Sequence, residues 1–188
     1  TRIEDISPLA SCTNLEIANL NESSITSISP LANCTKMRKI DLESTAVEDI
    51  SALSRMTQLE TLFLNFTHVS DLSPLRHCKR LKKLSAEETQ IRDLSPLAEL
   101  KELEILDLDA TLITSIEPLR GCINLTDLYI EGTSIDSVEP LALLKRLERV
   151  ILTGTRITDI TPLSKCQQLA RLLLNNTAVS SLEPLRNS

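Results

Sequence analysis

The stretch Leu59–Leu75, with the sequence LETLFLNFTHVSDLSPL, decides the fold of this chain. In order, it contains Leu59, Leu62, Leu64, Thr67, Val69, Leu72 and the triplet Ser73-Pro74-Leu75. The same pattern returns every 22 residues along the chain, without an insertion or a deletion. A self-similar period of this length is the signature of a solenoid, in which each unit packs on its neighbours. The sequence therefore predicts one elongated array.

The prolines mark this period most clearly. All eight prolines fall at one phase, each followed by Leu, and Ala52-Leu53 fills the one gap. They are Pro8, Pro30, Pro74, Pro96, Pro118, Pro140, Pro162 and Pro184. We expect a single array of about eight units over residues 1–188. Neither terminal unit has the polar outer face of a solenoid cap, so we also expect the chain to be part of a longer protein.

Each unit is expected to contain one short strand and one short turn of helix. Leu62, Phe63 and Leu64 alternate as in a strand with one buried face, and equal phase in successive units predicts a parallel sheet. On the return path, Ser73 reads as an N-cap hydroxyl and Pro74 as the first turn of a helix. The remaining length allows only a 3₁₀ turn or one α turn. Strands about 4.8 Å apart, opposite bulkier turns, should place the sheet on the concave side.

A column of hydroxyl residues is expected to close each turn. Its members are Thr1, Ser23, Thr45, Thr67, Thr89, Thr111, Thr133, Thr155 and Thr177. The chain turns inward at this phase and leaves backbone groups without a sheet partner, which a buried hydroxyl can satisfy. We therefore predict a structural role for these residues rather than a catalytic one.

The five cysteines share another phase. They are Cys12, Cys34, Cys78, Cys122 and Cys166, and Met56, Leu100 and Leu144 fill the same slot elsewhere. Since Leu and Met substitute for Cys, the slot should hold a buried apolar group. The chain has no C-x-x-C motif and only two histidines, which argues against a zinc site.

The sequence is compatible with two compartments. Free buried thiols favour a reducing compartment, and hence the cytoplasm. N-x-S/T sequons keep a cell-surface or secreted origin as the alternative, at Asn21, Asn33, Asn65, Asn124 and Asn175. The repeat itself generates several of these sequons, because their Ser or Thr belongs to the hydroxyl column.

The composition argues against several functions. The net charge of −6 disfavours nucleic acid as the main partner, and no apolar run approaches the ~18 residues of a membrane span. We find no nucleophile–base set, and Gly121, Gly132 and Gly154 form no phosphate-binding loop. Carboxylates on an open sheet make a poor calcium cage or glycosidase cleft. We therefore expect no enzyme, no cofactor and no metal.

The consensus L-x-x-L-x-L-x-x-T-x-I-x-D-I-x-P-L-x-x-C resembles the leucine-rich repeat. The run Thr155–Leu163, TRITDITPL, is similar to the 22-residue, internalin-like class. Thr in place of the usual Asn, together with Cys in place of Leu, resembles repeats of kinetoplastid leucine-rich-repeat proteins. The resemblance implies an α/β fold: a right-handed solenoid with a parallel concave sheet and short 3₁₀ or helical turns on the convex side. It also implies a protein-recognition scaffold without catalytic residues.

The outward strand positions form three lanes along the predicted concave face. The first lane is Ile17, Lys39, Thr61, Lys83, Ile105, Asp127, Arg149 and Arg171. The middle lane is Asn19, Asp41, Phe63, Ser85, Asp107, Tyr129, Ile151 and Leu173. The third lane is Asn21, Glu43, Asn65, Glu87, Asp109, Glu131, Thr153 and Asn175.

These lanes carry the candidate partner-binding residues. Phe63 and Tyr129 share the middle lane about 15 Å apart, and exposed aromatic rings are common binding anchors. The acids are Asp41, Glu43, Glu87, Asp107, Asp109, Asp127 and Glu131. The sequence thus predicts a scaffold that binds a basic protein or peptide segment on its concave face. The alternatives are an extracellular adhesion or receptor ectodomain of internalin type, a targeting arm of a larger enzyme, or merely a solvated charged face. The sequence does not fix the oligomeric state.

Overall fold

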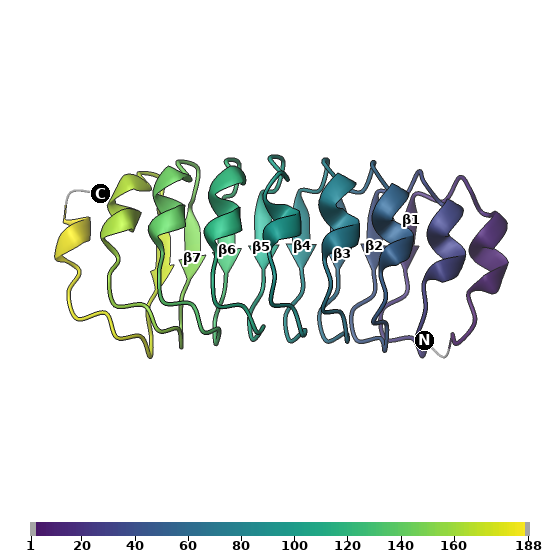
Figure 1. The fold of residues 1–188 in the computed structure, drawn as a ribbon, viewed down its shortest axis with the longest axis horizontal. Coiled ribbons are helices and arrows are strands. Elements are labelled where there is room, and N and C mark those ends of the chain that lie inside the picture. The colour runs from purple at the N-terminus through teal and green to yellow at the C-terminus, as the bar shows by residue number, and fades with distance from the viewer. Residues whose placement is uncertain (1–2, 187–188) are drawn as a thin grey trace.

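A computed structural model describes residues 3–186 as one solenoid (Figure 1). The strands are β1 (Ile17–Asn19), β2 (Lys39–Asp41), β3 (Thr61–Phe63), β4 (Lys83–Ser85), β5 (Ile105–Asp107), β6 (Asp127–Tyr129), β7 (Arg149–Ile151) and β8 (Arg171–Leu173). The 3₁₀ segments are η1 (Ser7–Ser11), η2 (Ser29–Asn33), η3 (Ser51–Arg55), η4 (Ser73–His77), η5 (Ser95–Leu97), η6 (Glu117–Gly121), η7 (Glu139–Leu143), η8 (Thr161–Lys165) and η9 (Glu183–Leu185).

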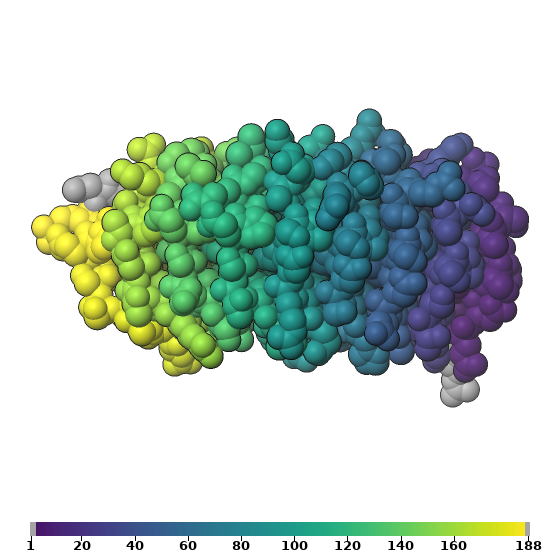
Figure 2. All heavy atoms as spheres, in the orientation of Figure 1, coloured from purple at the N-terminus to yellow at the C-terminus, as the bar shows by residue number. Residues whose placement is uncertain are grey.

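The strands form one parallel eight-stranded sheet in chain order. Every pair is offset by one repeat, so Ile40 lies beside Leu62 and Leu62 beside Leu84. The 3₁₀ segments are stacked along the opposite side of the array (Figure 1). In the space-filling view the repeats are successive bands of one elongated body (Figure 2). The predicted parallel sheet and short 3₁₀ turns are confirmed.

One continuous apolar core runs between the sheet and the 3₁₀ segments. In the unit that begins at Leu59, the core residues Leu62, Leu64, Val69 and Leu75 are all fully buried. The equivalent residues of neighbouring units pack in the same way, because each unit covers the apolar edge of the one before it. The stacking of units, rather than any single unit, therefore stabilises the fold.

The predicted N-cap was wrong. Ser73 lies inside η4, and no side chain caps the segment in the usual way. Instead, Asp71 accepts the backbone N–H of Ser73 at 2.7 Å and the Ser73 hydroxyl at 2.7 Å. Where Glu replaces Ser, as at Glu117, the earlier residue is Ser115, whose hydroxyl accepts the N–H at 3.2 Å. With Ser115 before Glu117, the backbone N–H keeps its acceptor, and two carboxylates are not placed next to each other.

The hydroxyl column has the predicted structural role. Thr67 Oγ1 donates to the carbonyl of Leu64 at 2.6 Å, and Thr89 Oγ1 donates to that of Ala86 at 2.8 Å. Corresponding bonds are made by Ser23, Thr45, Thr111, Thr133, Thr155 and Thr177. Thr1 lies outside the described residues. The column therefore satisfies the carbonyl that the end of each strand leaves free.

Four of the cysteines are buried as predicted, namely Cys34, Cys78, Cys122 and Cys166. Their thiols also donate to a carbonyl of the preceding unit, as in Cys166 Sγ to Leu141 O at 3.3 Å. Burial raises the pKa of Cys78 to about 11. For Cys12 the expectation of burial was wrong: it is exposed, because no described unit packs outside the first one.

Candidate partner-binding face

The lanes place both candidate aromatic anchors on the concave face. Phe63 ends β3 and Tyr129 ends β6, and each side chain is partly exposed. The remaining aromatic residue, Phe66, is 41% exposed but lies in the turn after β3, where φ is 56°. Phe63 and Tyr129 are therefore the two rings of the described chain that occupy the sheet face.

Two lysines flank the ring of Phe63. The ammonium groups of Lys39 and Lys83 lie 5.4 and 5.0 Å from the ring centroid. Both lysines belong to the first lane, with Thr61 between them in the sheet register. Each contact is a cation–π interaction, which holds the lysine stems close to the ring.

Tyr129 belongs to a second cluster, centred on a buried acid. Asp127 is only 3% exposed and forms an ion pair with Arg149 on the next strand. Its carboxylate also accepts the hydroxyl of Thr126 at 2.7 Å and that of Tyr129 at 3.5 Å. Asp127 is thus placed to orient Arg149 and Tyr129 rather than to touch a partner directly.

The other acids of the face are at least partly exposed and have no cationic partner among residues 3–186. They are Asp41, Glu43, Glu87, Asp107, Asp109 and Glu131. Their bonds within the described chain are to backbone N–H groups or neutral side chains, as in Glu131 N–H to Asp109 at 2.6 Å and Asn65 Nδ2 to Glu43 at 3.3 Å. No ion pair between residues 3 and 186 includes any of them. These six acids, which form the acidic cluster of the face, are therefore not neutralised by any ion pair of the described chain.

Two acids of this face, Asp109 and Glu87, have raised pKa values, chiefly because they are partly buried. Partial burial raises the pKa of Asp109 to about 7, with the nearby charges of Asp107, Glu131 and Glu87 acting in the same direction. Burial, followed by Asp107 and other acids, also raises the pKa of Glu87. A cation placed beside Asp109 would favour its ionised form, so the cluster is suited to receive positive charge.

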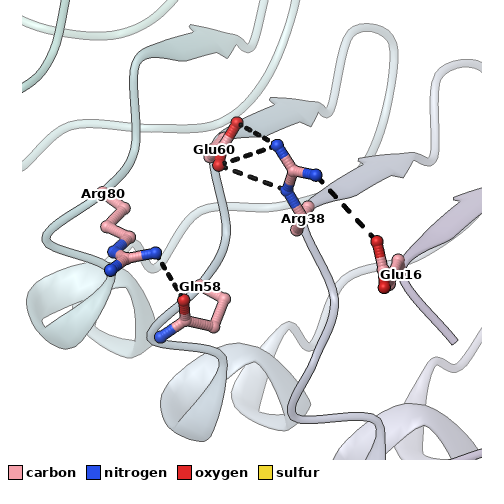
Figure 3. A network of polar contacts seen from close by, with 5 residues as sticks. All are labelled: Glu16, Arg38, Gln58, Glu60 and Arg80. Carbon is pink, nitrogen blue, oxygen red and sulfur yellow. Dashed lines mark hydrogen bonds and ion pairs between the residues drawn. The ribbon is translucent and has the colours of Figure 1, made fainter. Parts of the chain in front are cut away.

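At the upstream edge of the sheet, in the residues before the strands, several long polar side chains bond to polar or oppositely charged partners of the neighbouring unit. Arg38 bonds Glu60 with two nitrogens at 3.2 Å and lies 4.0 Å from Glu16 (Figure 3). Arg80 donates to Gln58 at 2.6 Å in the same stack. Exposed pairs of this kind add little stability, but the Arg38–Glu60 pair neutralises those two charges. Sequence reasoning missed this network, whose signal is opposite or complementary polar residues 22 positions apart.

The sequons differ in accessibility. Asn65 is 9% exposed, and its amide donates to Glu43 while its carbonyl accepts the N–H of Glu87. The amide of Asn124 donates to the carbonyl of Lys101 at 2.9 Å. Asn33 and Asn175 are exposed. A glycan would therefore fit Asn33 or Asn175 better than Asn65.

Residues 3–186 contain neither a cluster of metal-ligating side chains nor a membrane-spanning helix. No group of three or more His, Cys, Asp or Glu residues in this part of the chain is arranged to hold a metal ion. No helix of the described chain is long and apolar enough to span a bilayer.

Comparison with known proteins agrees with this architecture. The family model "Leucine Rich repeats (2 copies)" matches residues 13–55, 57–99 and 79–121. Among curated proteins, none matches this chain at a significant level.

Several solved structures share the fold of this chain. Internalin C2 of Listeria monocytogenes is 30% identical, with a TM-score of 0.89 over 92% of this chain and 76% of that one. Internalin inlF of the same organism is 31% identical, with a TM-score of 0.82 over 94% of this chain and 58% of that one. A leucine-rich-repeat protein of Leptospira interrogans shares the fold at 20% identity, with a TM-score of 0.89 over 95% of this chain and 48% of that one.

The chain thus spans between about half and three quarters of the length of these proteins. Its period, its parallel sheet and the family match agree with one another. This chain belongs to the leucine-rich-repeat family, in the 22-residue, internalin-like repeat class.

Proposed function

We propose that this chain is a non-enzymatic scaffold that binds a partner protein on its concave face. Leucine-rich-repeat domains serve to bind proteins, and in this chain the sheet face carries the residues suited to that task. One observation carries the proposal: Phe63 and Tyr129 share the middle lane, beside accessible carboxylates that have no cationic partner among the described residues. Rings of this kind act as anchors, and a field of one sign attracts a partner of the other.

The partner is a protein or peptide segment that carries basic residues. It would contact Asp41, Glu43, Glu87, Asp107, Asp109 and Glu131 directly. Asp127 would act through Arg149 and Tyr129, because it is buried beneath them. Electrostatic attraction of this kind raises association rates and weakens with added salt.

The test combines affinity capture with one pair of substitutions. Proteins retained by the immobilised chain are identified, and the affinity of a purified one is measured against the unmodified chain and the Phe63→Ala/Tyr129→Ala variant. We expect binding to weaken by at least about tenfold, while stability changes by no more than about 1 kcal/mol. Phe66→Ala is the matched control, because it removes an exposed ring outside the lanes.

The outcomes separate clearly. Unchanged affinity in the double variant would place the binding surface elsewhere. Loss of folding in the double variant would show that the two rings belong to the core. Affinity that does not fall as salt is added would contradict the role of the carboxylates.

The likeness to two internalins favours a second candidate, an adhesion or receptor ectodomain at the cell surface. A glycan on exposed Asn33, or a Cys12–Cys34 disulfide, in native material would support this candidate. Five reactive thiols after denaturation of native material would contradict it and favour a reducing compartment such as the cytoplasm.

A further inference from the structure

The two lysines around Phe63 make the upstream side of the concave face positive. The ammonium groups of Lys39 and Lys83 lie 5.4 and 5.0 Å from the ring centroid. Neither forms an ion pair or a side-chain hydrogen bond within residues 3–186. Thr61 lies between them in the register and is partly exposed, so its hydroxyl can donate on the same surface.

The carboxylates of two nearby acids, Glu60 and Asp41, are bonded to other groups. Glu60 precedes Thr61, but its carboxylate is bonded to Arg38. Asp41 follows Lys39 along β2, and its carboxylate accepts the backbone N–H of Glu43 at 3.2 Å. The lysines therefore keep their charge available for a ligand, and the ring limits their motion.

The sign of the free charge changes across the strands. Lys39 and Lys83 lie in the first lane, at the start of β2 and β4, whereas Glu43, Glu87 and Asp109 lie in the third lane, two residues beyond the end of a strand. Four residues in fully extended conformation span at most about 13 Å. An α-helix with its side chains is about 10–12 Å wide. A helix lying along the array would thus place its two flanks over charges of opposite sign, with Phe63 and Tyr129 beneath its centre.

We propose that Lys39, Thr61 and Lys83 form a subsite that accepts a carboxylate of the partner. The partner segment is then an amphipathic helix with one acidic flank over this subsite and one basic flank over the third lane. This inference rests on the proposed function and adds the shape and the charge pattern of the partner. The asymmetry also fixes the direction of the helix, because reversing it would exchange the two flanks.

Two synthetic helical peptides of equal length test the subsite. Both carry the same apolar ridge; one has Glu on one flank and Lys on the other, and the second has Lys on both flanks. We expect the peptide with divided charge to bind the unmodified chain about tenfold more tightly. In Lys39→Gln/Lys83→Gln this order should reverse, since the subsite loses its positive charge. Lys79→Gln/Lys101→Gln is the matched control, because both side chains are exposed outside the lanes, and it should leave the order unchanged.

The results distinguish the subsite from the face itself. Equal or tighter binding of the all-basic peptide to the unmodified chain would overturn the subsite, as would an unchanged order in Lys39→Gln/Lys83→Gln. If the all-basic peptide still binds and Phe63→Ala/Tyr129→Ala abolishes that binding, the concave face stands and only the subsite is lost. Affinities that are insensitive to Phe63→Ala/Tyr129→Ala, or no binding of either peptide, would overturn both proposals. Circular dichroism of each variant verifies that it is folded.

Discussion

Asp127 and Arg149 form an ion pair between β6 and β7 in which the acid is buried and the base stays half exposed. The register places them side by side in the first lane. Asp127 also accepts hydroxyls from Thr126 and Tyr129, so one carboxylate organises side chains from two strands. Removing the charge of Asp127, or the groups that bond to it, would leave buried polar atoms without a partner.

Asp127→Asn should therefore lower the free energy of unfolding by about 1–2 kcal/mol, because the amide cannot replace the charge that holds Arg149. Chemical denaturation of Asp127→Asn, Arg149→Gln and the double variant measures the coupling between the two residues. We expect the double variant to be less destabilised than the sum of the single changes by about 1 kcal/mol. Additive effects would show that the pair contributes nothing beyond its separate contacts.

Asp109 predicts an unusual pH dependence of stability. Its pKa is raised to about 7, chiefly by burial, whereas an aspartate in an unfolded chain titrates near ~3.9. Since the folded chain binds this proton more tightly, the contribution of Asp109 to stability falls as pH rises from the unfolded value through about 7. Asp109→Asn should be more stable than the unmodified chain at pH 8, with the difference shrinking or reversing at pH 5. The exposed Asp136→Asn variant is the control for the loss of one charge.

The raised pKa of Asp109 also predicts that the affinity for a basic partner depends on pH. A cation beside Asp109 favours the ionised carboxylate, so binding releases a proton when the pH lies near or below the raised pKa. Affinity for a lysine-rich peptide should fall as pH decreases from 8 to 6. Asp109→Asn should bind more weakly at pH 8 and lose most of this dependence. An identical pH profile in both proteins would exclude Asp109 as the titrating group.

Gly121 is required by the shape of the preceding unit. Segment η5 is shorter than its neighbours, and a Cβ at Gly121 would lie 2.0 Å from the carbonyl oxygen of Ala98. Gly121→Ala should lower the free energy of unfolding by more than about 2 kcal/mol, because the carbonyl of Ala98 is a backbone group and cannot rotate away. Leu143→Ala changes an exposed residue at the same phase of the next unit, and we expect less than about 0.5 kcal/mol there. Similar melting temperatures for the two variants would contradict the clash.

Asp71, rather than the predicted Ser73, accepts the hydrogen bonds at the start of η4. Its two bonds to Ser73 lower the pKa of the carboxyl, so its contribution is present above the unfolded pKa and is lost as pH falls through the folded one. Asp71→Ala should cost about 1 kcal/mol at pH 7. Asp71→Ser should cost less, because a hydroxyl accepts the backbone N–H at the equivalent position of other units. Equal losses in both variants would show that the hydrogen bond to the N–H is unimportant.

The sequence predicted some features of the candidate face and missed others. Phe63 and Tyr129 could be placed outside the core because their phase alternates with fully buried leucines. The burial of Asp127 and Asn65 could not be foreseen, because it depends on how long side chains of neighbouring units fold over them. The Asp71 cap was missed because Ser at the start of a helix ordinarily accepts a hydrogen bond itself.

The amino-acid sequence alone determined the period, the parallel register and the core, because an unbroken 22-residue repeat stacks equivalent backbone and apolar groups on one another. Only the tertiary structure decided which outward residues remain accessible and which charges are neutralised. Lys39 and Lys83 come together on Phe63, and Asp109 is partly desolvated among other acids. Those relationships arise from side-chain packing across repeats, and the variable positions that produce them do not follow the period.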